Sequence, residues 1–501
     1  MTNYTSKIIK NSSVVFIMLI LAAGLGYIFR LILARTLSIE EFGLFFAIFA
    51  FLNMLYGFKS MGVGAAFIRF VGEYKEKKNY EKIKALVIYF FLIQLIIFGL
   101  ISIILFSFSK YLTLNYFKTS KALLPFIILN VAFFFSIFVS TFRGFFQAYQ
   151  KTEYYSSIEF IQTLAAIIIT LILLKFGFDF LAPPYAYLFS FVLVSFLYFF
   201  LFLKVFPFFK TRFILDLPIL KKLIAFSVPI IIGAIASSVI SSEDTVLLTY
   251  FRSLKEVALY SVAMPTVNMM RYIPKALSVV IFPISTQLYL KNVKRLSAAL
   301  TQMYKYLFIL MVPLAFLIFS FSKEILNIFF GKNFADAAIC MSILSLAMIF
   351  NTIYIVNQNI LIGTDKPKVY VKALFIEAII STLLDLILIP RYGIYGAAVT
   401  ALISSMCLLL VTSIEIRKHI ANEIPWQPWI KTILVGITTV GLVYFLKKII
   451  ELNIYLKLGI ILIIASIFYL FQIFLIKLIT LKEIKKILCG VIPEKFKKNI
   501  C

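Results

Sequence analysis

Histidine and cysteine are nearly absent from this 501-residue sequence, which limits the chemistry available to it. The single histidine, His419, lies in a predicted basic loop, so a histidine-based catalytic centre is excluded. No two of the four cysteines have Cys-x-x-Cys spacing, and neither a disulfide framework nor a zinc site is predicted. The sequence therefore predicts no catalytic residues and no metal centre built from cysteine and histidine.

Charged residues are also scarce. They make up 14% of the chain, against about 25% in soluble domains. Hydrophobic residues make up 62%, and the mean hydropathy is +1.02. A soluble core cannot cover that much apolar surface, because burial is limited by the ratio of surface to volume. The composition predicts an all-α integral membrane protein that crosses the bilayer many times.

Apolar stretches long enough to span a bilayer, about 20 residues each, occur fourteen times. The first is longer than a signal-peptide core and lacks a small-residue cleavage pattern, so it is interpreted as an uncleaved helix. The predicted spans are approximately 11–33, 42–64, 84–107, 121–142, 155–175, 182–206, 222–243, 257–288, 302–322, 338–361, 370–389, 393–414, 431–449 and 455–479.

The net charge of +27 lies mainly in short loops and in the C-terminal tail. About 33 basic residues fall on the side that holds the N-terminus and about 13 on the other. Basic residues favour the cytoplasmic side, which predicts cytoplasmic N- and C-termini, as an even number of spans requires. The excess is interpreted as setting orientation and meeting anionic headgroups, not as binding nucleic acid.

An internal repeat is visible at an offset of about 215 residues. Leu31 to Phe49 (LILARTLSIEEFGLFFAIF) matches Val246 to Met264 (VLLTYFRSLKEVALYSVAM), which places Gly43 opposite Ala258. The turns that end at Gly177 and Gly393 correspond in the same way. Duplication of a six-helix unit is predicted, with parallel repeats because each unit has an even number of helices.

The repeat predicts three regions: a six-helix bundle at 1–210, its repeat at 211–420, and two additional helices with a basic tail at 421–501. Two equivalent bundles can rock about a site between them, so that the site faces one side and then the other. This architecture is typical of a transporter. No ion-selectivity filter motif favours a channel.

Several segments resemble a known family. LARTLSIEEFGLF (Leu33 to Phe45) and GVGAAFIRFVGEY (Gly62 to Tyr74) are similar to the signature of the polysaccharide-biosynthesis, O-antigen-type flippases. The segments SSEDTVLLTYF, FPISTQLY and IPRYGIYGAAVTALIS extend the resemblance through the second half. These flippases belong to the multidrug/oligosaccharidyl-lipid/polysaccharide (MOP) exporter superfamily, together with MATE multidrug extruders and lipid II flippases.

The resemblance implies a V-shaped, MATE-like pair of bundles around a central cavity. It also implies the flipping of a polyprenyl phosphate- or diphosphate-linked oligosaccharide to the outer leaflet of the cell membrane, for cell-surface glycan biosynthesis. The expected partners are this substrate, membrane lipids, and a glycan polymerase or glycosyltransferases.

Basic residues inside predicted spans are candidates for binding the anionic headgroup, because buried charges usually face a cavity or a partner. Arg271 and Lys275 are four residues apart on the proline-rich eighth span and are expected to share one face. Arg30 lies in the last turns of the first span, and Arg69 lies just after the second. Structural ion pairs and snorkelling to the interface remain alternatives.

Acidic residues inside spans are candidates for coupling or gating. Glu377 and Asp385 lie on the eleventh span, and Asp244 ends the seventh, where the repeat places it opposite Arg30. Na⁺ or H⁺ is therefore the expected coupling ion. An ion pair between Arg30 and Asp244 that breaks when the outer side opens is one alternative, and hydrogen bonding between helices is another.

Two other functions remain open. A MATE-type, cation-coupled antiporter would favour acids over bases in its cavity, whereas the deepest charged pair here is Arg271 and Lys275. A membrane-embedded glycosyltransferase or ligase typically needs catalytic groups in sizeable outer loops, which are short here. No GxxxxGK[ST] sequence occurs, so ATP is not expected to drive the protein directly.

Overall fold

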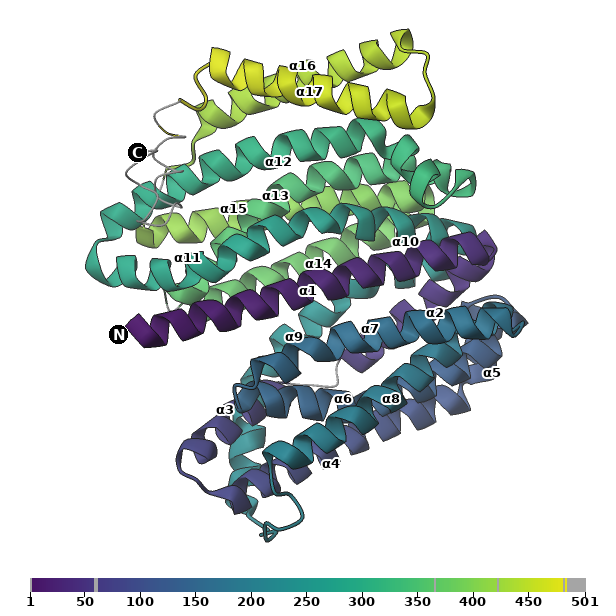
Figure 1. Cartoon of the computed structure of the whole chain (residues 1–501), viewed down its shortest axis with the longest axis vertical. Helices are drawn as coiled ribbons and strands as arrows, with labels where there is room; N and C mark the ends of the chain where they lie inside the picture. The colour runs from purple at the N-terminus through teal and green to yellow at the C-terminus, as the bar shows by residue number, and fades with distance from the viewer. Residues whose placement is uncertain (1, 58–61, 365, 421–422, 481–482, 484–501) are drawn as a thin grey trace. The chain divides into compact units, whose positions relative to one another are not determined.

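The structure is a computed structural model that describes residues 2–57, 62–364, 366–420, 423–480 and 483. Every regular element within these ranges is helical (Figure 1). The α-helices are α1 (Thr2–Thr36), α2 (Ile39–Gly57), α3 (Val63–Glu76), α4 (Tyr80–Ser107), α5 (Ser109–Tyr111), α6 (Leu123–Ala148), α7 (Thr152–Lys175), α8 (Ala182–Val205), α9 (Leu217–Phe251), α10 (Leu254–Asn268), α11 (Tyr272–Lys291), α12 (Val293–Phe329), α13 (Ala338–Gly363), α14 (Pro367–Tyr392), α15 (Ile394–Ile420), α16 (Trp426–Ile449) and α17 (Ile454–Leu475). Short connecting turns are η2 (Leu112–Tyr116), η3 (Ser120–Ala122), η4 (Asp179–Leu181), η5 (Met269–Arg271) and η6 (Lys332–Ala337).

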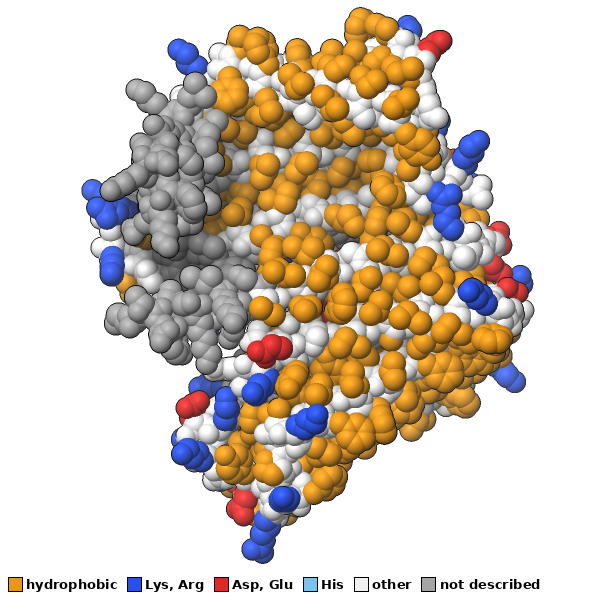
Figure 2. All heavy atoms as spheres, viewed as in Figure 1, with side chains coloured by type: hydrophobic (Ala, Val, Ile, Leu, Met, Phe, Trp, Pro, Cys, Tyr) orange, Lys and Arg blue, Asp and Glu red, His pale blue; other side chains and the backbone are white. Residues whose placement is uncertain are grey.

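Twelve helices in the described residues are long and apolar enough to cross a membrane individually. A thirteenth span results if the two bent segments of α9, Leu217–Val228 and Gly233–Phe251, are counted as one. Hydrophobic side chains cover most of the face in Figure 2, and most of its charged side chains lie near the margins. The prediction of an all-α membrane protein is confirmed, and the count of fourteen is approximate.

The predicted span 257–288 differs most from the structure. It is divided into α10 and α11 by the 3₁₀ turn η5. Pro265 lies inside α10 and Pro274 in the first turn of α11. Because proline lacks a backbone donor, an unbroken helix cannot continue through this region without losing hydrogen bonds. The predicted second span is likewise divided between α2 and α3, and residues 58–61 between them lie outside the described residues.

Local sequence signals explain where several helices begin and turn. Asn79 Oδ1 accepts a hydrogen bond from Lys82 N at the start of α4, and Asp216 Oδ1 accepts one from Ile219 N at the start of α9. The repeat-related Gly177 and Gly393 both have positive φ, at 79° and 57°. Glycine adopts this conformation without steric cost, so both turns can reverse the chain tightly.

The chain forms two compact units. The first contains residues 1–266, 326–340 and 371–404, and the second contains 267–325, 341–370 and 405–501. In the first unit α6 packs on α4 and α8, around an aromatic core in which Phe67 and Phe90 stack at 4.3 Å. In the second, α16 and α17 pack as a pair, and Lys447 on α16 forms an ion pair with Glu324 on α12 at 2.5 Å. These units are groups of packed helices and do not test the predicted boundaries at 210 and 420.

Candidate functional site

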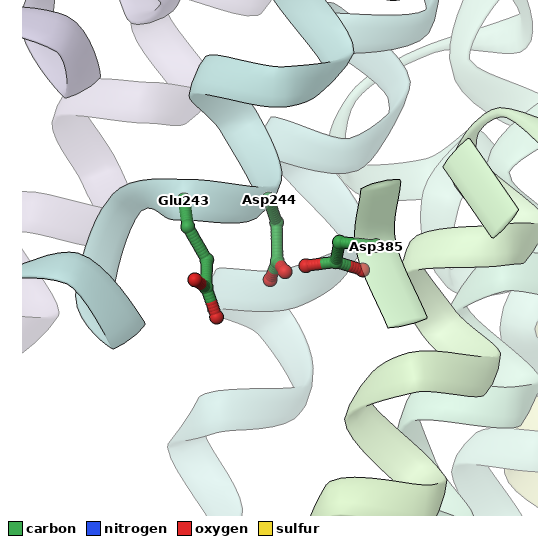
Figure 3. Close-up of side chains that lie close together, drawn as sticks. All are labelled: Glu243, Asp244 and Asp385. Atoms are coloured by element: carbon green, nitrogen blue, oxygen red, sulfur yellow. The ribbon is translucent and has the colours of Figure 1, made fainter. Parts of the chain in front are cut away.

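Three carboxylates from two helices converge inside the first unit (Figure 3). Glu243 and Asp244 lie on α9, and Asp385 lies on α14. One oxygen from each lies within 4.8 Å of the others. Figure 3 shows the side chains of Asp244 and Asp385 pointing toward each other, with Glu243 beside them. The side chain of Asp385 is fully buried, and Glu243 is 4% exposed.

The three carboxylates differ in their hydrogen bonding. Glu243 accepts hydrogen bonds from the hydroxyls of Ser381 and Thr382, the latter at 2.6 Å. Asp244 accepts one from the hydroxyl of Tyr260. Neither oxygen of Asp385 accepts a hydrogen bond from any described residue. A buried carboxylate normally has donors around it, and the groups nearest to Asp385 are the carboxyl of Asp244 and the hydroxyl of Thr400.

The charge of the cluster is not balanced by the protein around it. None of the three carboxylates forms an ion pair with a lysine or arginine of the described ranges. Carboxylates this close repel one another, so the cluster is stable only with bound protons or a cation. Oxygen ligands on opposite sides of a hard cation are about 5 Å apart, given metal–oxygen distances of about 2.4 Å. The spacing therefore suits a single small cation.

The sequence predicted only part of this cluster. The structure brings Asp244 and Asp385 together as candidates, but the cluster does not include Glu377. Glu377 is eight residues before Asp385 on α14, about 12 Å along the axis, so a shared helix face does not place it at the same depth. Glu243 was missed as a candidate because adjacent helical residues point about 100° apart. Its short polar neighbours on α14, Ser381 and Thr382, have no local sequence signal that links them to α9.

Arg30 is half-buried on α1 and belongs to the same unit. Its Nη1 donates to the carbonyl oxygen of Ser261 at 2.9 Å, and its guanidinium carbon lies 4.0 Å from the centroid of the Phe46 ring. The ion pair between Arg30 and Asp244, one of the alternatives drawn from the repeat, is not among the ion pairs of the described residues, and Asp244 accepts a hydrogen bond from Tyr260. The cation and the acidic cluster are thus kept apart within one unit.

The other three basic candidates lie in different surroundings. Arg69 is exposed on α3, with its guanidinium 4.6 Å from the Phe226 ring centroid. Arg271 ends η5, and Lys275 lies exposed in the first turn of α11, with its Nζ 5.6 Å from the Tyr272 ring centroid. The sequence placed Arg271 near the middle of a continuous helix, and the structure places it at the break. Arg271 and Lys275 belong to the second unit.

At the C-terminal end of α1, helices of the two predicted repeats meet within the first unit. Arg35 donates to the carbonyls of Ile328 and Phe329, at 2.5 and 3.1 Å, at the end of α12. Gly43 on α2 faces Leu254 on α10 so closely that a Cβ at Gly43 would lie 2.0 Å from the Leu254 carbonyl oxygen. These contacts hold α1 against α12 and α2 against α10.

The second unit contains an apolar cavity of about 460 Å³ between α12, α16 and α17. Pro313 and Leu317 line it from α12, Val440 from α16, and Ala465 from α17. Its few polar groups include the hydroxyl of Tyr469, which donates to the Ile309 carbonyl at 2.7 Å. An apolar chain fits such a cavity better than a sugar does.

Comparison with known proteins identifies the family. The family model of polysaccharide biosynthesis proteins matches residues 8–289, more than half of the chain. This chain belongs to the polysaccharide biosynthesis protein family. The MatE family model matches residues 229–387, which include α9 from residue 229 on, α10 to α13, and the part of α14 that bears Asp385. Membership of the MOP superfamily, predicted from the sequence, is thereby confirmed.

Two curated relatives are similar in sequence to this family member. An uncharacterized membrane protein of Methanocaldococcus jannaschii is 29% identical over 505 residues, covering 98% of this chain and 99% of the relative. A probable low-salt glycan biosynthesis flippase, Agl15 of Haloferax volcanii, is 26% identical over 162 residues, or 32% of this chain and 34% of the relative. The second similarity covers only about a third of each protein.

Among solved structures, the lipid II flippase MurJ in an inward closed conformation has the same fold as this family member. The TM-score is 0.73 at 16% identity, covering 91% of this chain and 97% of that one. At such low identity the likeness shows the fold alone. Family, fold and relatives together identify a multi-pass membrane protein of the flippase and transporter type.

Proposed function

We propose that this protein flips a lipid-linked oligosaccharide, carried on polyprenyl phosphate or diphosphate, from the cytoplasmic to the outer leaflet of the cell membrane. It does so by alternating access, with both termini in the cytoplasm, and serves cell-surface glycan biosynthesis without catalysing a reaction. Binding of Na⁺ or a proton at Glu243, Asp244 and Asp385 drives the change of state. Family membership and the flippase relative support the class of cargo.

One observation carries the proposal: Arg30 and the acidic cluster lie in the same unit and are not paired. In a low-dielectric interior, opposite charges are stabilised by pairing with each other. Keeping them apart leaves the carboxylates for an external cation. It also leaves donors of the Arg30 guanidinium for an external anion, and arginine suits phosphate because its donors form a planar fork.

Arg271, Lys275 and Arg69 extend the proposed headgroup-binding set. In this proposal Arg69 meets the phosphate as the substrate arrives from the leaflet. The apolar cavity beside α16 and α17 takes part of the prenyl chain, since its lining is almost entirely hydrocarbon.

Cation binding and substrate release are coupled through the close contact between α2 and α10. Asp244 lies on α9 and accepts a hydrogen bond from Tyr260 on α10, the helix whose Leu254 contacts Gly43. Neutralising the cluster with a cation removes repulsion between α9 and α14. In the proposed cycle this change in α9 and α14 is transmitted through Tyr260 to the contact between α2 and α10.

The test is reconstitution of the full chain in vesicles that contain a fluorescent polyprenyl-diphosphate oligosaccharide. Leaflet exchange is measured by the access of a membrane-impermeant oxidant to the sugar, with an imposed Na⁺ or proton gradient. Exchange above that of empty vesicles, and faster with one gradient, is the expected result. Exchange equal to that of empty vesicles contradicts the flippase, and exchange indifferent to both gradients removes the coupling.

A cation antiporter is the second candidate, favoured by the acidic cluster and by the MatE match. The cluster is compact enough for a single small cation, whereas an organic cation needs a wider site. Efflux of a fluorescent organic cation from the same vesicles decides between the two functions. Recovering the lipid-linked sugar chemically unchanged after exchange excludes glycosyl transfer.

A further inference from the structure

The connection between α8 and α9 is non-helical and exposes several apolar side chains. Residues 206–216 join Val205, which ends α8, to Leu217, which begins α9. Phe209 is 73% exposed and Leu215 is 71% exposed, and Phe213 is also exposed. Exposed apolar residues are expected on helices that face lipid. These three lie outside the spanning segments and need a separate explanation.

The connection is held against the first turns of α4. Lys84 Nζ donates to the Thr211 carbonyl at 2.8 Å, and Lys82 Nζ lies 3.6 Å from Asp216 Oδ2. The backbone N–H of Asp216 donates to the Tyr89 hydroxyl at 2.8 Å. These contacts fix one side of the connection to the protein, so the outward direction of the other side is built into the fold.

Lys84 also indicates how deep the connection lies in the membrane. Lys84 is the last charged residue before the apolar run of α4, which reaches Lys110 without another charge. A charge at the end of such a run marks the boundary between hydrocarbon and headgroups. Because Thr211 is hydrogen-bonded to Lys84, the connection lies at that boundary.

Basic residues are interleaved with the exposed apolar ones. Lys210 and Arg212 are both exposed, between Phe209 and Phe213. Apolar side chains beside Lys and Arg are the pattern of segments that lie in a membrane interface and bind anionic lipids. An acidic soluble protein would match the charge of Lys210 and Arg212. It would not explain why Phe209 and Phe213 lie at the boundary between hydrocarbon and headgroups.

We propose that residues 209–215 form a docking surface for anionic lipids of the leaflet at the α4 N-terminal end. Phe209, Phe213 and Leu215 enter the acyl boundary, and Lys210 and Arg212 contact the lipid phosphates. The connection thereby anchors the junction of α8 and α9 to the membrane surface. This surface is separate from the cargo and cation sites and does not depend on them.

Insertion is tested with the full chain carrying Phe209→Trp, or Leu215→Trp, in vesicles with acyl-brominated lipids. The added tryptophan, measured against the two native ones, is expected to be quenched by the brominated chains and protected from aqueous iodide. Strong iodide quenching without lipid quenching overturns the proposal and leaves the surface to a soluble partner. If Phe209→Trp does not fold, Leu215→Trp provides the same quenching measurement.

The preference for anionic lipids is tested in the same tryptophan background. Brominated phosphatidylglycerol is expected to quench more strongly than brominated phosphatidylcholine at equal fraction, and K210Q/R212Q removes the difference. The matched control is K175Q/K332Q, which removes two exposed lysines elsewhere on the first unit and leaves the difference intact. Equal quenching by both lipids before any lysine or arginine is changed overturns the headgroup contact.

Discussion

A β-carbon added at Gly43 would lie 2.0 Å from the carbonyl oxygen of Leu254 and 3.2 Å from the backbone nitrogen of Ala258. The sequence repeat placed Gly43 and Ala258 at equivalent positions, and in the structure these positions lie against each other. Helices α2 and α10 approach this closely only because residue 43 has no side chain. The contact between α2 and α10 therefore depends on that glycine.

Gly43→Ala is expected to reduce leaflet exchange at least tenfold while the protein still inserts and folds. The new methyl group meets backbone atoms, which cannot rotate away. Keeping the contact between α2 and α10 therefore costs about 1–3 kcal/mol, as in other overpacked sites. The exchange assay and the thermal midpoint measure the two effects. Gly24→Ala is the control, since nothing lies within 4 Å of a Cβ there. An unchanged exchange rate for Gly43→Ala contradicts a role for this contact in the transport cycle.

Asp385→Asn is expected to abolish the response of exchange to the driving cation gradient. The amide removes a buried negative charge that forms no ion pair with a described residue. The thermal midpoint is therefore expected to stay equal or rise. If the coupling ion is Na⁺, added Na⁺ stabilises the unsubstituted protein through binding and loses that effect in the variant.

Glu377→Gln is the matched control for the cluster. It changes the other predicted acid of α14 to its amide but lies outside the cluster. Gradient dependence is expected to persist in this variant. Loss of coupling in Glu377→Gln together with normal coupling in Asp385→Asn would transfer the role to Glu377.

Arg271→Ala is expected to abolish exchange without reducing the amount of folded protein in the membrane. Arg271→Lys restores only part of the activity, because lysine keeps the charge and loses the two-pronged contact with phosphate. Arg143→Ala removes a partly buried arginine, paired with Glu159 at 3.1 Å, and serves as the control with normal exchange. Normal exchange by Arg271→Ala refutes its assignment to the headgroup.

Val440→Trp is expected to fill part of the apolar cavity and to slow the exchange of long-chain substrates more than that of short-chain analogues. Ile437→Trp on the same helix is the control, because Ile437 is 55% exposed and does not line the cavity. Exchange rates with carriers of two chain lengths provide the measurement. An equal effect on both lengths, or none, argues against a prenyl chain in this cavity.

Much of the fold could be predicted because hydropathy is a local property. The spans expected at 393–414 and 431–449 correspond to α15 and α16. The divided helix at 257–288 was harder to predict: the sequence shows a proline-rich span, but not that α10 and α11 would be separated by the turn at Met269–Arg271. The outcome at a proline depends on whether neighbouring helices can satisfy the freed carbonyls, which is a tertiary property.

The sequence by itself determined that the chain is a bundle of apolar helices in a membrane, and its motifs indicated the family. It also supplied a short list of charges inside the spans. Only the tertiary structure decided that Glu243, Asp244 and Asp385 meet, that Glu377 does not join them, and that Arg30 stays apart from Asp244. The reason is physical: hydropathy and helix periodicity act over neighbouring residues, whereas the approach of α9 to α14 depends on how whole helices pack.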